Sequence, residues 1–307
     1  MERRGSSATG QAFARAGLLG NPSDAYGGRT LAFSVFDFAA RVRVTPAERT
    51  SIPDPRAERL IAAALARYAR HTASPATPVL VELESDIPFQ VGLSGSSAIV
   101  IATLRALAAL YDRPLSPFDQ AELALAVEVE DLGIAAGPMD RVTQAYEGLL
   151  AMDFRSPRRP ESYESLAPAL LPAMLIAWHP EGGNPSGTVH SDVRERWQRG
   201  DPALQDAMRQ FAALADRGRV ALRDRDHPAL RRAVDANFDL RSEWFPIAER
   251  DREMVELARR SGASAKQCGS GGACLIVLDA EAHAPPLIRN LEAAGYATLR
   301  PKVERPT

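Results

Sequence analysis

Apolar and polar positions along the chain follow patterns typical of both helices and strands. The most apolar segment, residues 98–111, consists mainly of Ala, Leu, Ile and Val and contains no Gly or Pro, which predicts a largely buried helix. Further helices are expected at residues 57–71, 117–132, 191–260 with breaks near 200–202 and 227–228, and 285–294. Strands are expected at residues 14–19, 31–46, 79–83, 149–154, 171–179 and 296–303. The order of these elements predicts a mixed helix and strand protein.

Residues 156–168 interrupt this pattern with a segment rich in Pro, Arg and Ser. Such a composition is typical of a connection between domains. A chain of 307 residues with 45% hydrophobic content can bury one large core or two ordinary ones. We therefore expect an N-terminal domain at 1–160 and a C-terminal domain at 161–307.

Composition and charge indicate which partners and which cellular location to expect for this protein. The formal net charge is −2, so we expect neither nucleic acid nor an anionic membrane as the main partner. The two cysteines, Cys268 and Cys274, match no zinc or disulfide framework. No apolar leader or uninterrupted membrane-length segment is visible, so the sequence predicts a cytoplasmic protein.

Directly before the most apolar segment lies a loop rich in Gly and Ser, at residues 88–97. Its glycines leave the backbone free of Cβ atoms, so several N–H groups can converge on one anion at the start of the following helix. The sequence predicts a polyphosphate site, although such a turn also forms plain helix caps. The loop lacks the Lys of a Walker A motif, so the positive charge must come from elsewhere.

A second glycine cluster, residues 266–274, lies between two segments with strand character. Glycine weakens a strand, so a ligand or another backbone is expected to approach closely there. A tight hairpin turn is the alternative explanation.

Several charged residues are candidates for chemistry. Asp140 could orient a hydroxyl and accept its proton during phosphoryl transfer, although it could equally cap a helix. Arg15 could hold a phosphate, and Glu128 or Glu130 could bind Mg²⁺ together with the Ser97 hydroxyl. Each of these residues could instead lie on the solvated surface.

Three segments, residues 15–28, 88–98 and 266–274, resemble the three signature motifs of the GHMP kinases, which include galactokinase, homoserine kinase, mevalonate kinase and phosphomevalonate kinase. The first segment has Asn21-Pro22 where galactokinases have Glu-His. Together with Met139-Asp140-Arg141, the segments look most like the glucuronokinase branch.

This resemblance implies a two-domain α+β fold, with an N-terminal domain like domain 2 of ribosomal protein S5 and a ferredoxin-like C-terminal domain. It implies Asp140 as the catalytic carboxylate with Arg15 as its cationic neighbour, Ser97 and Glu128 as Mg²⁺ ligands with Glu130 in reserve, and Asp24 on a sugar hydroxyl. Gly271 and its neighbours would support nucleotide and substrate. The residues implied to wrap the ATP phosphates are Gly92, Leu93, Ser94, Gly95, Ser96 and Ser97.

The function that follows is an ATP- and Mg²⁺-dependent kinase that phosphorylates the anomeric hydroxyl of a hexuronic acid, with glucuronate as the first expected acceptor. An Arg side chain is the natural receptor for the acceptor's carboxylate, and Arg141 and Arg194 are both candidates. Two alternatives stay open. The acceptor could be another sugar, a heptose or a mevalonate-like alcohol, or the protein could be a non-catalytic nucleotide or sugar sensor.

Overall fold

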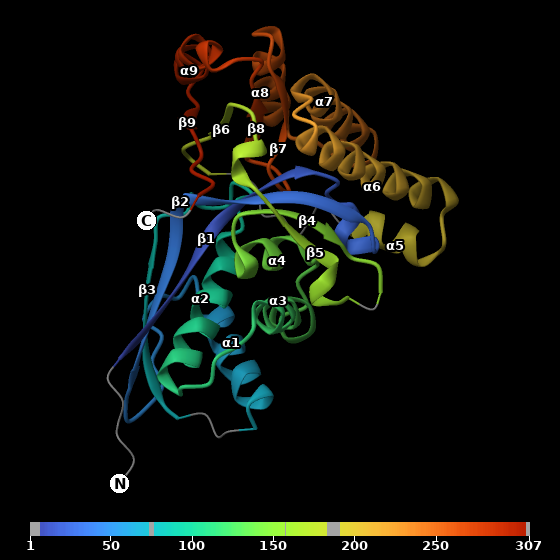
Figure 1. Ribbon diagram of the computed structural model, residues 1–307. Helices are drawn as coiled ribbons and strands as arrows, with labels where there is room; N and C mark the ends of the chain where they lie inside the picture. Colours follow the sequence, from blue (N-terminus) through green and yellow to red (C-terminus); the bar gives the residue numbers. More distant parts are fainter. Residues whose placement is uncertain (1–6, 74–76, 157, 183–190, 305–307) are drawn as a thin grey trace. The chain divides into compact units, whose positions relative to one another are not determined.

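The computed structural model describes residues 7–73, 77–156, 158–182 and 191–304 (Figure 1). The chain divides into two compact units that each collect separate segments. Unit 1 takes the chain up to Ala14, then Asp37–Ile87 and Ser94–Glu147, whereas unit 2 takes Arg15–Phe36, Pro88–Leu93 and the chain from Gly148 onward. Two long strands, β1 (Ala8–Leu19) and β2 (Arg29–Pro46), contribute to both units. The domain boundary expected near residue 160 stays a prediction.

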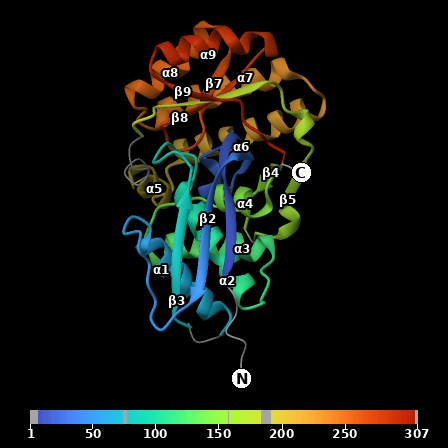
Figure 2. The same cartoon turned by 90° about the vertical axis from the view of Figure 1, so that its left-hand side faces the viewer.

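Unit 1 places helices against one face of its strands (Figure 2). Strand β3 (Val79–Ser85) pairs antiparallel with the second half of β2. Gly10 of β1 shows how closely strand and helix pack, because a Cβ there would lie 2.1 Å from the Ala102 carbonyl oxygen. The helices of this unit are α1 (Glu58–His71), α2 (Gly95–Leu110), α3 (Pro117–Ala126) and α4 (Met139–Tyr146).

Unit 2 contains two groups of strands. Strand β4 (Leu149–Asp153) pairs with the first half of β2 and with β5 (Tyr163–Leu166). A second, antiparallel sheet has the order β7-β8-β6-β9. Its strands are β6 (Met174–Trp178), β7 (Ser264–Gln267), β8 (Ala273–Val277) and β9 (Ala297–Leu299).

The helices of unit 2 are α5 (Ser191–Gln198), α6 (Pro202–Arg223), α7 (His227–Trp244), α8 (Glu249–Arg260) and α9 (Ala284–Ala293). A buried apolar cluster joins α7, α8 and α9 to the second sheet. Its members include Leu175 and Ile276 from the strands, and Phe238, Met254 and Leu287 from the helices. The two-unit α+β architecture agrees with the fold class expected from the resemblance.

Most predicted elements are confirmed within a few residues, including the helix breaks near 200 and 227. There Asp201 and Asp226 cap α6 and α7, each accepting a hydrogen bond from a first-turn amide. Three details differ. Strand β1 begins at Ala8, β5 lies inside the expected domain connection, and the helix predicted to end at 132 changes at Val127 into a π-turn, Val127–Asp131.

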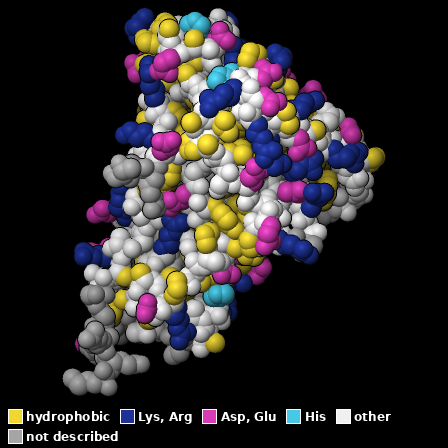
Figure 3. Space-filling model, in the orientation of Figure 1, with side chains coloured by type: hydrophobic (Ala, Val, Ile, Leu, Met, Phe, Trp, Pro, Cys, Tyr) yellow, Lys and Arg dark blue, Asp and Glu magenta, His cyan; other side chains and the backbone are white. Residues whose placement is uncertain are grey.

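On the face shown in Figure 3, basic and acidic side chains are interspersed rather than gathered into patches of one sign. Within residues 7–73, 77–156, 158–182 and 191–304, no helix combines the length and apolar character needed to cross a membrane.

Candidate functional site

The N-terminus of α2 is arranged differently from an ordinary capped helix. Ser94 occupies the N-cap position with a left-handed backbone, φ 64°, and its side chain makes no capping hydrogen bond. No described residue accepts a hydrogen bond from the amides of Gly95, Ser96 and Ser97. Because the first amides of a helix have no partner within it, this end can donate to an anion. The plain helix cap considered as an alternative is therefore not what Ser94 forms.

Asp140 lies beside this helix end, within unit 1. The Ser94 hydroxyl donates to Asp140 Oδ2 at 2.6 Å, and Arg141 Nη1 lies 3.6 Å from the same oxygen. The Asp140 side chain is 20% exposed, so the carboxylate is held in place and still accessible. Asp140 lies inside the first turn of α4, whose N-cap residue is Pro138, so the helix-cap alternative does not apply to it.

Glu128 forms a second, fully buried cluster in unit 1. The Ser97 hydroxyl donates to Glu128 at 3.2 Å, and Arg141 pairs with the same carboxylate. Arg141 also donates to the Gly137 carbonyl at 2.7 Å. Glu130, the reserve candidate, is instead 65% exposed and pairs with Arg67 at 2.9 Å. The π-turn causes this difference, because it directs Glu128 inward and leaves Glu130 on the surface.

The oxygen atoms around Ser97 could supply some of the ligands of Mg²⁺, but not a complete set. A hydroxyl and a carboxylate, both hard oxygen ligands, lie side by side at the N-terminus of α2. Mg²⁺ commonly binds one or two protein oxygens and takes its remaining ligands from phosphates and water. In the part of the chain that the structure describes, no group of three or more His, Cys, Asp or Glu residues is arranged to hold a metal alone. The site therefore suits an ion that arrives with a nucleotide.

Arg15 connects the two glycine-rich segments of unit 2. Its Nη1 donates to the carbonyls of Gly92 at 2.6 Å and Cys268 at 3.3 Å, and its amide donates to the Leu93 carbonyl at 3.2 Å. Gly92 has φ 76°, and a Cβ there would lie 2.5 Å from the Gly271 oxygen. The two segments therefore touch backbone to backbone. Glycine is required there because a side chain has neither space nor a favourable conformation.

Asp24 lies in the short 3₁₀ helix Ser23–Tyr26 and is buried within unit 2. Lys266 fixes the chain just before it. Its Nζ donates to the carbonyls of Gly17 and Gln267, at 2.9 and 2.7 Å, and to Asn21 Oδ1 at 3.0 Å. The predicted sugar-binding loop and the third motif are thus held together by one buried lysine side chain.

The sequence analysis assigned no role to Asp251, a residue that supports the third motif. Asp251 accepts hydrogen bonds from Gln267 Nε2 at 2.7 Å and from the Gly272 amide at 3.0 Å. A Cβ on Gly271 would lie 2.7 Å from Asp251 Oδ2. Asp251 follows the start of α8 without any local motif. Nothing in its neighbourhood along the chain signals this role.

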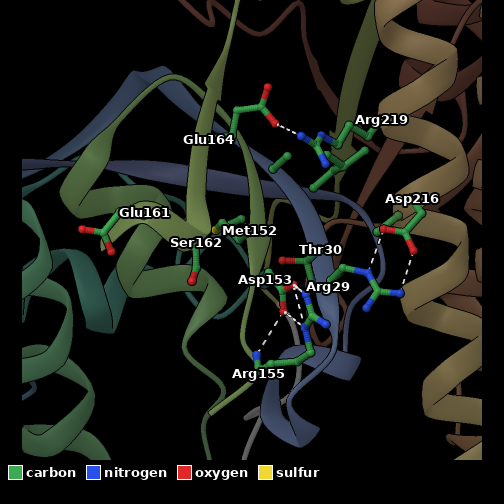
Figure 4. Close-up of a pocket in the computed structure, with 13 residues that line it drawn as sticks. Arg29, Thr30, Met152, Asp153, Arg155, Glu161, Ser162, Glu164, Asp216 and Arg219 are labelled. Carbon is green, nitrogen blue, oxygen red and sulfur yellow. Dashed lines mark hydrogen bonds and ion pairs between the residues drawn. The ribbon is translucent and has the colours of Figure 1, made fainter. Parts of the chain in front are cut away.

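A pocket of about 330 Å³ in unit 2 lies apart from these predicted residues (Figure 4). The arginine side chains that line it form ion pairs with neighbouring carboxylates. Arg29 pairs with Asp216, Arg155 with Asp153, and Arg219 with Glu164. None of the predicted site residues lines it, and its cations already have carboxylate partners.

The predicted site residues are thus divided between the units. Unit 1 brings Ser94 to Asp140 and Ser97 to Glu128 and Arg141, with Gly95 and Ser96 in the same helix turn. Unit 2 brings Arg15 to Gly92 and Leu93, and it also contains Asp24 and Gly271.

Comparisons with known proteins agree with these motifs. Residues 59–148 match the GHMP kinases N terminal domain. Glucuronokinase 1 of Arabidopsis thaliana is 35% identical to this chain. The alignment of 333 residues covers 95% of this chain and 90% of that protein.

Two solved structures show the same fold. The mevalonate kinase of Methanococcus jannaschii has a TM-score of 0.74 at 18% identity, covering 97% of this chain and 99% of that one. The galactokinase of Lactococcus lactis, complexed with galactose, has a TM-score of 0.79 at 12% identity, covering 98% and 94%. The chain belongs to the GHMP kinase family.

Proposed function

We propose that the protein is an ATP-dependent kinase that transfers the γ-phosphoryl group to the anomeric hydroxyl of a hexuronic acid, with glucuronate as the first candidate. The observation that carries this proposal is the 35% identity to glucuronokinase 1 over 95% of the chain.

In the proposed reaction, the acceptor oxygen forms a bond to the γ-phosphorus as the bond to the β–γ bridging oxygen breaks, and ADP leaves. Asp140 accepts the hydroxyl proton. The hydrogen bond from Ser94, at 2.6 Å, orients the Asp140 carboxylate, and the Arg141 guanidinium 3.6 Å away supports its negative charge. The amides of the first turn of α2, together with Gly92 and Leu93, bind the phosphates. Most of the rate comes from this positioning and charge stabilisation.

Ser97 and Glu128 would hold Mg²⁺, which supplies charge neutralisation to the phosphates when bound. Ser97 presents its hydroxyl at the helix end, and Arg141 orients the buried Glu128 carboxylate by pairing with it. In unit 2, Asp24 would bind a sugar hydroxyl, Arg15 would hold the phosphate loop in shape, and Gly271 would allow close approach of the ligand. We also propose a cytoplasmic location, because the buried thiols of Cys268 and Cys274 are free and suit a reducing compartment.

A coupled ADP-release assay tests the proposal directly. We expect turnover with glucuronate, weaker turnover with neutral hexoses, and none with mevalonate. A preference for mevalonate, a heptose or a neutral hexose would replace the acceptor assignment and keep the kinase. ATP binding without turnover across the whole panel would favour a sensor and overturn the enzymatic assignment.

A further inference from the structure

Arg241, on α7 of unit 2, is a buried cation whose guanidinium donates through Nε to another residue that the structure describes, but not through its Nη groups. Its exposed fraction is 2%, and its Nε donates to Gln267 Oε1 at 2.8 Å. The guanidinium carbon lies 4.9 Å from the centre of the Phe245 ring. Among the described residues, neither Nη nitrogen has a hydrogen-bond partner. Gln267 and Phe245 therefore hold the guanidinium in place, while its two Nη groups can still donate hydrogen bonds to a ligand.

Among the residues that the structure describes, Arg241 also has no carboxylate in direct contact with its positive charge. No ion pair joins it to a carboxylate within the described residues, whereas Arg105, also largely buried, pairs with Glu147 at 2.8 Å. Burial lowers the pKa of Arg241 to about 10, and the charges of Asp251 and Asp24 offset this only in part. A buried charge that lacks a contacting partner of opposite charge is strongly unfavourable. A fold tolerates that penalty where an anionic ligand supplies the missing charge.

The surroundings of Arg241 connect it to the proposed acceptor site. Asn237 lies one helical turn before it on α7, so the two side chains share a face. The Asn237 side chain accepts from the Gly20 amide at 2.8 Å and donates to the Asn21 carbonyl at 3.5 Å. This face of α7 therefore meets the first motif. Asp24, the proposed ligand of a sugar hydroxyl, is near enough to act electrostatically on Arg241 without forming an ion pair with it.

We propose that Arg241 binds the carboxylate of the uronate acceptor through its two Nη groups, with Asp24 on a sugar hydroxyl of the same molecule. This inference rests on the proposed function and names the residue that selects an acid over a neutral sugar. A guanidinium matches a carboxylate with two parallel hydrogen bonds, and its orientation here is already set by Gln267 and Phe245.

Neither Arg candidate from the sequence fits this role as well. Arg141 is committed to Glu128 and to the Gly137 carbonyl. Arg194 lies on α5 with an exposed side chain, where water weakens its attraction for a carboxylate. Arg241 combines burial, a fixed orientation and unused donors.

The test compares glucuronate with glucuronamide, which has the same ring and a neutral C6 group, in Arg241→Gln and Arg241→Lys. For Arg241→Gln we expect kcat/KM for glucuronate to fall about 10- to 100-fold, mainly through KM, with kcat/KM for glucuronamide changed less than about threefold. Arg241→Lys keeps the charge but loses the two-pronged contact, so we expect a smaller loss that is again confined to glucuronate. Arg232→Gln, an exposed change on the same helix, is the matched control.

The alternative is that Arg241 only supports the third motif through Gln267. Equal losses for both acceptors in both variants would establish that role and overturn the inference. A loss confined to glucuronate in Arg194→Gln, absent from the Arg241 variants, would transfer the assignment to Arg194. If Arg241→Gln does not fold, Arg241→Lys alone decides between equal and selective losses. Wild-type protein that turns over no uronate refutes the proposed function itself, independently of any variant.

Discussion

At the scale of single residues, the contacts of each carboxylate distinguish acids that look alike in the sequence. Asp140 is partly exposed, accepts a hydrogen bond from Ser94 and lies at the end of α2. Glu128 is fully enclosed with Ser97 and Arg141, and Glu130 is exposed. The first arrangement leaves a carboxylate that a substrate hydroxyl can reach, and the second holds a carboxylate in place beside a hydroxyl and a guanidinium.

Replacing Asp140 by Asn tests the proton acceptor. The amide oxygen can still accept the hydrogen bond from Ser94, but it cannot take the hydroxyl proton, so we expect kcat to fall by about 10²- to 10⁴-fold with ATP affinity kept. Steady-state kinetics and nucleotide titration measure the two effects. Asp112→Asn, an exposed change in the same unit, is the control. Near-normal turnover of Asp140→Asn would remove this residue from the mechanism.

Removing the Ser97 hydroxyl tests the metal assignment. In Ser97→Ala the ion loses one of its two proposed protein ligands, so the Mg²⁺ concentration for half-maximal activity should rise by about tenfold. The measurement is a Mg²⁺ titration at saturating ATP and acceptor. An unchanged Mg²⁺ dependence would count against Ser97 as a ligand.

At the scale of elements, unit 2 joins the phosphate loop and the β7–β8 hairpin through glycine backbones. Gly92, Gly271 and Gly272 all have positive φ, and side chains at these positions would meet backbone or buried polar atoms. The second glycine cluster is therefore a hairpin turn and also a surface of close backbone approach. Both explanations offered from the sequence apply to it.

Gly272→Ala tests this close approach against a matched glycine. At Gly272, φ is 89° and a Cβ would lie 2.7 Å from Val91 Cα, whereas Gly262 has φ 82° with nothing within 4 Å. Both variants suffer the same backbone strain, of about 1 kcal/mol. We expect Gly272→Ala to lower the free energy of unfolding by about 1–3 kcal/mol more than Gly262→Ala, measured by urea denaturation. Equal losses would mean that the backbones can move apart freely.

Lys266, which ties β7 to the first motif, should make stability depend on pH. Burial, assisted by the charges of Arg241 and Arg15 and opposed by those of Cys268 and Cys274, lowers its pKa from 10.5 to about 7. Between these values the unfolded chain binds the proton and the folded protein does not. The free energy of unfolding therefore rises with pH across this window and is lowest below pH 7, where both states are protonated.

Urea denaturation of wild type and Lys266→Met between pH 6 and 9.5 measures this effect. We expect the wild type to gain stability relative to the variant above pH 7, with a slope of at most about 1.4 kcal/mol per pH unit. The subtraction cancels groups that titrate equally in both proteins. Parallel curves would show that the three carbonyl acceptors keep Lys266 charged throughout.

At the scale of the whole molecule, the family follows from the 35% identity to glucuronokinase 1, and the fold by itself does not select the acceptor. The chain resembles solved mevalonate kinase and galactokinase structures over almost their whole lengths, at identities of only 18% and 12%. A fold does not fix the function of a protein, so the choice of acceptor lies in side chains.

Nucleotide binding should stabilise the protein without any acceptor. At an ATP concentration about 100 times Kd, with Mg²⁺, we expect about 2.7 kcal/mol of added stability, seen as a higher unfolding temperature. Asp140→Asn should show the same shift, because that carboxylate acts on the acceptor. The absence of any shift in the wild type would contradict the phosphate-binding role of the α2 N-terminus.

Most of the fold could be predicted because hydrophobic periodicity and caps are local properties. The breaks near Gly200 and His227 are examples, and so is the buried helix that begins after Ser94. The exceptions also have physical reasons. β1 and β2 are buried along most of their length, so alternation does not mark their ends, and β5 is only four residues long.

The sequence by itself determined the order of the elements, the three glycine-rich motifs and the set of residue types available for phosphoryl transfer. Only the tertiary structure decided which of these residues act together. Ser94 meets Asp140 across 46 positions, and Arg15 meets Cys268 across 253. Contacts at such separations depend on how the chain packs, and so do the burial of Glu128 rather than Glu130 and the burial of Arg241 against Gln267 and Phe245. Local patterns report the face and propensity of a segment, but a charge acquires its role from the dielectric and the partners that the fold places around it.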